Sequence, residues 1–60
     1  MTLLDAITEA SKAGYRIHQD EDGWWVTTPK RPRRPSEVLG SHHDEARAWF
    51  AACSMSRRQQ

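Results

Sequence analysis

The sequence predicts a small α+β domain in which an antiparallel sheet packs against two helices. Three observations support this fold class. Apolar stripes with helical spacing lie near both ends of the chain, and two segments with strand-like alternation flank an Asp-Gly turn between them. The chain has 60 residues, which is enough for a single domain. The expected order is helix, strand, strand, an optional third strand, and helix.

The first helix is expected from about Thr2 to Ala13. Thr2 can cap its N-terminus, and Asp5 three residues later resembles the partner of a capping box. The apolar stripe with i, i+3, i+4, i+7 spacing consists of Leu3, Leu4, Ile7 and Ala10. Gly14 stands where a glycine with left-handed backbone ends many helices. These signals together define both ends of the helix.

A β-hairpin is expected after this helix. Residues 15–19 alternate apolar and polar side chains, residues 20–23 form an acidic turn, and residues 24–28 return as the second strand. Asp-Gly followed by aromatic and β-branched residues is a strong hairpin signal. The acidic turn resembles a calcium loop in composition, but it lacks the spacing of calcium ligands.

The register of this hairpin depends on the length of its loop. If Asp22-Gly23 is a two-residue loop, Ile17 opposes Thr28 and Gln19 opposes Val26. The face toward the core then carries Tyr15, Ile17, Trp24 and Val26. The outer face carries Arg16, His18, Trp25 and Thr27. A three-residue loop would exchange Trp24 and Trp25 between the two faces, so both alternatives stay open.

Residues 29–35 read Pro-Lys-Arg-Pro-Arg-Arg-Pro. Three prolines fix φ and remove backbone donors, so this segment cannot be a helix or a central strand. We expect an extended, polyproline-like basic loop that is mobile. Residues 36–40 are a plausible short third strand, of which only Val38 and Leu39 are apolar.

The last element is expected to be a second helix. Ser41 is a suitable N-cap, and Asp44 and Glu45 lie where negative charge favours the helix dipole. The apolar stripe consists of Ala46, Trp49, Phe50 and Cys53. Residues 56–60 are expected to be a frayed C-terminal tail. Two amphipathic helices can cover one face of the sheet; alternatively one helix covers it and one stripe is left for a dimer partner.

The expected core unites the apolar faces of all these elements. Its members are Leu4, Ile7, Tyr15, Ile17, Trp24, Val26, Val38, Ala46, Trp49, Phe50 and Cys53. Cys53 is the only cysteine, so it closes no bridge within the chain, and it is expected to be buried and inert. A single thiol, the lack of a long apolar run and the lack of a basic N-terminal region together predict a cytoplasmic location in a bacterial host cell, without membrane insertion.

No catalytic or metal-ligating constellation is evident in the sequence. His42 and Glu45 are i, i+3 neighbours on the second helix and supply two ligands, where metal sites need three or four. Cys53 lies about 16 Å further along the helix axis and cannot join them. No nucleophile elbow, phosphate-binding glycine loop or dinucleotide motif is present. The expectation is a binding protein that is no enzyme and uses neither cofactor nor metal.

Charge divides unequally between the two halves of the chain. Residues 1–28 carry five acidic and two basic side chains, a balance of −3, whereas residues 29–60 carry three acidic and seven basic ones, a balance of +4. Such asymmetry indicates an anionic partner for the basic half. The candidate binding residues are Lys30, Arg31, Arg33, Arg34, Trp25 and Arg16.

Two stretches resemble small uncharacterised bacterial and phage domains. The first is Asp22-Gly23-Trp24-Trp25-Val26 followed by Pro29, and the second runs from Ser41 through Trp49 with an E-A-x-x-W pattern. The resemblance covers about residues 15–53. The basic segment 29–35 departs from the usual glycine-containing turn. The resemblance implies a phage or mobile-element setting, with anti-restriction and anti-CRISPR proteins as one such class, and it assigns no functional residue.

These observations lead to one main hypothesis and two alternatives. The main hypothesis is a phage or mobile-element protein that inhibits or modulates a host protein by surface binding. The first alternative is a nucleic-acid-binding accessory domain that uses the basic loop, although the overall pI near 8 is modest for a dedicated nucleic-acid binder. The second alternative is a homodimer whose task is assembly.

Overall fold

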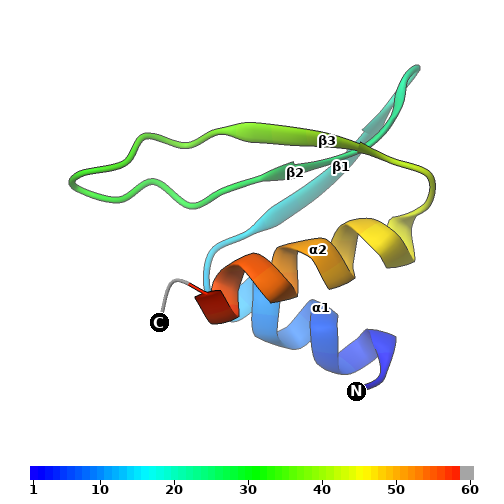
Figure 1. The fold of residues 1–60 in the computed structure, drawn as a ribbon, viewed down its shortest axis with the longest axis horizontal. Helices are drawn as coiled ribbons and strands as arrows, with labels where there is room; N and C mark the ends of the chain where they lie inside the picture. The colour runs from blue at the N-terminus through cyan, green and yellow to red at the C-terminus, as the bar shows by residue number, and fades with distance from the viewer. Residues whose placement is uncertain (59–60) are drawn as a thin grey trace.

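The computed structural model describes residues 1–58 and has the expected α+β class, including the third strand (Figure 1). The elements are α1 (Leu3–Lys12), β1 (Arg16–Asp20), β2 (Gly23–Thr27), β3 (Val38–His42) and α2 (Glu45–Arg58). The three strands form one antiparallel sheet in the order β1-β2-β3. The fold is therefore a meander flanked in sequence by two helices.

Helix α1 begins and ends as its sequence predicts. The Thr2 backbone nitrogen donates to Asp5 Oδ2 at 3.1 Å and the Asp5 nitrogen donates to Thr2 Oγ1 at 3.2 Å, which completes the capping box. The same Thr2 backbone N–H lowers the pKa of the Asp5 carboxyl. Gly14 follows the helix with a φ of +96°, and a Cβ at this position would lie only 2.9 Å from Pro29 Cβ. A larger residue at position 14 would therefore be both strained and crowded.

The register of the β1–β2 hairpin differs from the expected one by two residues. Ile17 opposes Val26 and Asp20 opposes Gly23, so the loop is Glu21 and Asp22 rather than Asp22-Gly23. The backbone nitrogen of Asp22 donates to Asp20 Oδ1 at 2.8 Å, and Gly23 takes the positive φ of +136° at the start of β2. The Asp20 carboxylate therefore closes the turn over residues 21 and 22, and Gly23 already belongs to β2.

The assignment of faces survives this correction because a shift of two residues preserves the alternation of a strand. Tyr15 and Val26 are fully buried, and Ile17 and Trp24 pack against the core from the same side. The three-residue loop that would exchange the two tryptophans does not form. Trp25 consequently belongs to the outer face of the sheet.

Strand β3 begins two residues later than the expected segment 36–40 and contains a bulge. Trp24 pairs with His42 and Val26 pairs with Leu39, so Gly40 and Ser41 together oppose Trp25. A Cβ on Gly40 would lie 2.8 Å from Trp25 Cε3, which means that the indole ring covers this glycine. The absence of a side chain at residue 40 thus makes room for a large ring on the outer face.

The N-cap of α2 is Asp44 instead of Ser41. Ser41 lies within β3, and the Asp44 carboxylate accepts a hydrogen bond of 2.8 Å from the backbone nitrogen of Arg47. The expectation of a tail that frays from residue 56 is wrong up to Arg58, because α2 continues to that residue and Ser56 is buried. The expectation for residues 59–60 lies outside the described residues.

The core is made chiefly from small side chains on the helices and larger ones on the sheet. Helix α2 covers the sheet, while α1 packs mainly against α2 (Figure 1). The buried apolar residues are Ala6, Ala10, Tyr15, Val26, Ala48, Ala52 and Cys53. Alanines let the two helices approach closely, which turns the bulkier members of each sequence stripe toward the surface.

Three of the predicted core residues are exposed, so their prediction is wrong. Two of them lie on helices that are rotated to bury alanines, and the third lies on the outer face of the sheet. Leu4 is 71% exposed and Phe50 is 39% exposed, since their helices are rotated to bury alanines. Val38 is 57% exposed because it opposes Thr27 on the outer face of the sheet. Among the other predicted members, the half-buried ones are Ile7, Ile17, Trp24, Ala46 and Trp49. In residues 1–58 there is no helix with the length and apolar character that a membrane span requires.

Candidate functional site

Residues 29–35, here called the basic arm, extend the β2–β3 connection beyond the sheet (Figure 1). The backbone nitrogen of Arg31 donates to the Arg34 carbonyl at 2.8 Å, and the Arg34 nitrogen donates back to the Arg31 carbonyl at 3.2 Å. Pro32 and Arg33 therefore form a two-residue turn at the tip. The expected polyproline-like extended loop is wrong at this point, because proline also suits the second position of a reverse turn.

The root of the basic arm is closed by hydrogen bonds between Thr28 and Glu37, and it is also joined to the end of α1. The backbone nitrogen of Thr28 donates to the Glu37 carbonyl at 2.9 Å, and the Glu37 nitrogen donates to Thr28 Oγ1 at 2.8 Å. Arg31 Nη2 donates to the carbonyl of Ala13 at 3.3 Å, where α1 ends. A hollow of about 90 Å³ lies between this root and Met55 of α2. These contacts hold the start of the arm against the domain while its tip projects.

The four cations of the basic arm lack acidic partners. Lys30, Arg31, Arg33 and Arg34 are all exposed, and none of them forms an ion pair within residues 1–58. The side-chain ion pairs in this part of the chain are Arg47 with Asp44 and Arg57 with Glu9. The structure therefore brings the four sequence-predicted cations together on one projecting hairpin. Their mutual repulsion is relieved by solvent ions or by an anionic partner.

The remaining predicted residues, Arg16 and Trp25, lie on the outer face of the sheet. Arg16 opposes Thr27, at the end of the sheet from which the arm extends, and it is exposed. Trp25 lies further from the arm and is half-buried over Gly40. The tryptophan ring is thus less available for stacking than its sequence position suggests, whereas Arg16 can act beside the arm.

The β1–β2 turn lies at the opposite end of the sheet from the basic arm (Figure 1) and is acidic. Asp20, Glu21 and Asp22 are exposed in the β1–β2 turn. The Asp20 carboxyl has a lowered pKa because the Trp25 indole lies beside it and the Asp22 backbone N–H donates to it. The buried Trp25 Nε1 makes no hydrogen bond of good geometry within residues 1–58. The β1–β2 turn and the basic arm, at opposite ends of the sheet, therefore carry opposite charges.

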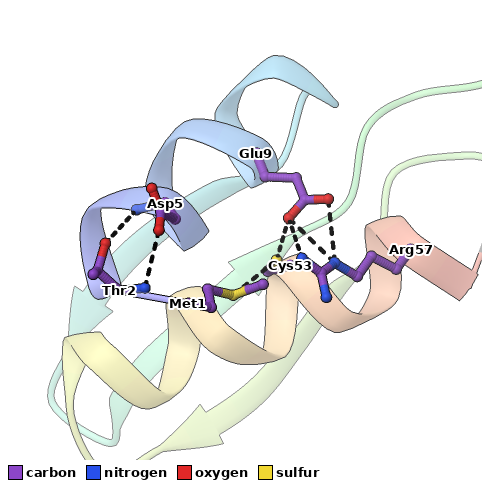
Figure 2. A network of polar contacts seen from close by, with 6 residues as sticks. All are labelled: Met1, Thr2, Asp5, Glu9, Cys53 and Arg57. Atoms are coloured by element: carbon purple, nitrogen blue, oxygen red, sulfur yellow. Dashed lines mark hydrogen bonds and ion pairs between the residues drawn. The ribbon is translucent and has the colours of Figure 1, made fainter.

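A polar network between the helices was not expected from the sequence (Figure 2). The Cys53 thiol donates to Glu9 Oε2 at 2.9 Å, and Arg57 donates to both Glu9 oxygens at 3.2 and 3.3 Å. The carboxylate of Glu9 and burial of the thiol raise the pKa of Cys53. A thiol held in its protonated form is a poor nucleophile, which agrees with its expected inert role. Spacing alone cannot reveal this network, because Glu9 and Arg57 lie far apart in sequence.

Within residues 1–58 no three His, Cys, Asp or Glu side chains are placed to share a metal ion. His42 and His43 lie at the junction of β3 and α2, away from Cys53 in the middle of α2. No family model, curated protein or solved structure matches this chain. The basic arm, with four exposed cations on one paired turn, is the candidate functional site of residues 1–58.

Proposed function

We propose that the chain is a nucleic-acid-binding accessory domain whose contact surface is the basic arm together with Arg16. The observation that carries this proposal is the set of four cations on a projecting hairpin without acidic partners in residues 1–58. Phosphate backbones attract such surfaces through release of condensed counterions. Arginine also forms two parallel hydrogen bonds to a phosphate, which suits an arm that has three of them.

The distribution of charge supports a fixed orientation on the nucleic acid. The basic arm and the acidic turn lie at opposite ends of the sheet (Figure 1). Repulsion between phosphates and the acidic turn would keep that end away while the arm approaches. A net charge of only +1 is compatible with binding because the local charge of the arm, and not the average, faces the partner.

The test is the affinity of the full chain for a fluorescent duplex of roughly 20 base pairs, measured by anisotropy at about 50 and 200 mM salt. The four-serine variant replaces Lys30, Arg31, Arg33 and Arg34 by serine. A control variant, Arg47→Ser with Arg58→Ser, removes exposed cations from α2 instead. We expect the four-serine variant to lose binding and the control to retain most of it. Equal losses in both would contradict a specific role for the arm.

The main sequence hypothesis, binding of a host protein in a phage or mobile-element setting, is the second candidate. Val38 favours it, because this apolar side chain is 57% exposed on the outer face near the arm. An acidic host protein could contact the arm and this apolar position at once. Its affinity would depend on salt less steeply than phosphate binding does. Retention of a lysate protein at high salt, lost on Val38→Asp, would favour this candidate.

A further inference from the structure

The tip of the basic arm places an apolar ring among cations. Pro32 and Arg33 form the turn, and Arg31 and Arg34 pair on either side of it. Pro32 is exposed and borders an open surface hollow together with the three arginines. Its ring is rigid and carries no backbone N–H. The most projecting part of the molecule is therefore a compact apolar point flanked by guanidinium groups.

The basic arm carries side chains that read guanine in the major groove but none that reads adenine or cytosine there. Residues 29–35 consist only of proline, lysine and arginine. Adenine and cytosine are read in the major groove chiefly by amide or acidic side chains, which accept hydrogen bonds from the bases. In the minor groove the pattern of donors and acceptors is degenerate, so an arm of cations recognises a duplex there through charge and shape. Arginine is the side chain favoured by the enhanced negative potential of a narrow minor groove.

The combination at the tip matches the physical requirements of minor-groove insertion. Proteins that bend DNA from this groove use cations for the groove and insert an apolar side chain, proline included, between base steps. In the basic arm both parts belong to one hairpin whose two strands lie about 5 Å apart. The cations can thus contact the phosphates on both sides of a base step, while the proline ring reaches the stacked bases of that step.

We propose that Pro32 is a wedge that enters the minor groove of duplex DNA and unstacks one base step, an inference that rests on the proposed function. Unstacking an intact step costs free energy, and the cost is lower at a mismatch or where a break in one strand makes the step easier to open. The preferred ligand is therefore duplex DNA with a nick or a mismatch. The arm recognises this weakened position by deformability and without regard to base sequence.

The experiment compares three probes with the full chain: an intact duplex of roughly 20 base pairs, the same duplex with a central nick, and one of its single strands. Anisotropy gives each affinity at about 50 mM salt. We expect binding to the nicked duplex to be about tenfold tighter than to the intact one. Energy transfer between dyes on the two duplex ends should rise on binding, since a wedge bends the helix.

Three proline variants separate the wedge from other effects. Pro32→Ala removes the apolar ring and should abolish the preference, so that nicked and intact duplex bind with about equal affinity. Pro32→Leu keeps an apolar wedge without the proline ring and should retain most of the preference. Pro35→Ala changes a proline at the base of the arm and serves as the matched control, with the preference unchanged. Thermal melting of each variant verifies that the fold is intact.

The outcomes distinguish failure of the wedge from failure of the proposed function. Equal wild-type affinity for nicked and intact duplex, or tighter binding to the single strand, would overturn the wedge but leave nucleic-acid binding in place. A preference that persists in Pro32→Ala, or is lost in both Pro32→Ala and Pro32→Leu, would also overturn it. Failure to bind any of the three probes would overturn the proposed function itself.

Discussion

The two turns of the sheet carry opposite charges and differ in what those charges contact. In the β1–β2 turn, the Asp20 carboxylate accepts a hydrogen bond of 2.8 Å from the Asp22 backbone and lies beside the Trp25 indole. In the basic arm, the cations meet no acidic side chain within residues 1–58. The first turn uses a charge to hold its own backbone. The second presents four charges, of which only Arg31 forms a hydrogen bond to the rest of residues 1–58, through the Ala13 carbonyl.

Under the proposed function, the stability of the sheet and the binding of nucleic acid depend on different turns. Substitutions in the acidic turn should weaken folding more than binding, and substitutions in the basic arm should do the reverse. Arg31 is the one arm cation with a hydrogen bond to the domain, at the Ala13 carbonyl. Substitution of Arg31 is therefore the arm substitution most expected to change folding as well as binding.

The largest expected effect comes from the four-serine variant of the basic arm. Duplex affinity should fall by about 100-fold or more at low salt, because four of the five proposed phosphate contacts are removed and only Arg16 remains. The free energy of unfolding should change little, since exposed substitutions typically alter it by about 0.5 kcal/mol or less. Anisotropy and urea melts measure the two quantities. A variant that unfolds while losing affinity would break the comparison, because the arm would then be a structural element.

The next largest effect is expected in the acidic turn. Asp20→Ala removes the acceptor that closes the turn and should lower the melting temperature by a few degrees, with duplex affinity unchanged. Asp22→Ala is the matched control, since it removes the same charge while the Asp22 side chain forms no hydrogen bond or ion pair within residues 1–58. Equal melting temperatures for the two variants would show that charge alone, and not the turn contact, matters here.

A pH dependence of stability follows from the lowered carboxyl pKa values. The Cys53 thiol and then Arg57 lower the pKa of Glu9, and the Trp25 indole lowers that of Asp20. A carboxyl with a lowered native pKa stabilises the fold above its unfolded value, and this contribution is lost as pH falls through the native value. Urea melts should therefore weaken below about pH 4. Glu9→Gln should flatten this decline, and an unchanged decline would exclude Glu9 as a contributor.

The raised pKa of Cys53 has the opposite sign and acts at the alkaline end. A thiol with a raised native pKa stabilises the fold below the unfolded value, near 8.5, and this contribution is lost as pH rises through the native value. Urea melts should weaken above about pH 9, and Cys53→Ala should remove that decline. A decline that persists in Cys53→Ala would assign it to another group.

The smallest expected effect is the change in duplex affinity when negative charges are removed from the acidic turn. Glu21→Gln with Asp22→Asn removes two negative charges and leaves Asp20 in place. Duplex affinity should rise at most a few-fold at low salt and not at all at high salt, because charges beyond about 10 Å are screened at 0.1 M. A large increase would place the acidic turn near the nucleic acid. It would contradict the orientation in which the arm alone approaches.

Much of the fold follows from local signals in the sequence. The capping box of Thr2 and Asp5 and the left-handed Gly14 depend only on neighbouring residues, and both are confirmed. The hairpin faces are also correct, since strand alternation is insensitive to a two-residue change of register. The register itself depends on whether the Asp20 side chain or the Asp-Gly pair closes the turn. Sequence pattern does not decide between these two.

The errors arise where tertiary packing overrides local pattern. Leu4 and Phe50 satisfy helical spacing, but close packing of alanines rotates each helix and leaves these side chains exposed. The bulge opposite Trp25 moves Ser41 into β3 and transfers the N-cap to Asp44. For the candidate site, the cations are evident from composition. Their arrangement as a hairpin depends on backbone pairing between Arg31 and Arg34, which composition does not reveal.

The salt dependence of duplex binding tests the central claim most directly. If the four arm cations and Arg16 all neutralise phosphates, the plot of log affinity against log salt has a slope of about −4.5, and the four-serine variant, which keeps Arg16, has a slope of about −0.9. The control variant with Arg47→Ser and Arg58→Ser should keep the wild-type slope. A wild-type slope near zero, or equal slopes for the wild type and the four-serine variant, would contradict the assignment of binding to the basic arm.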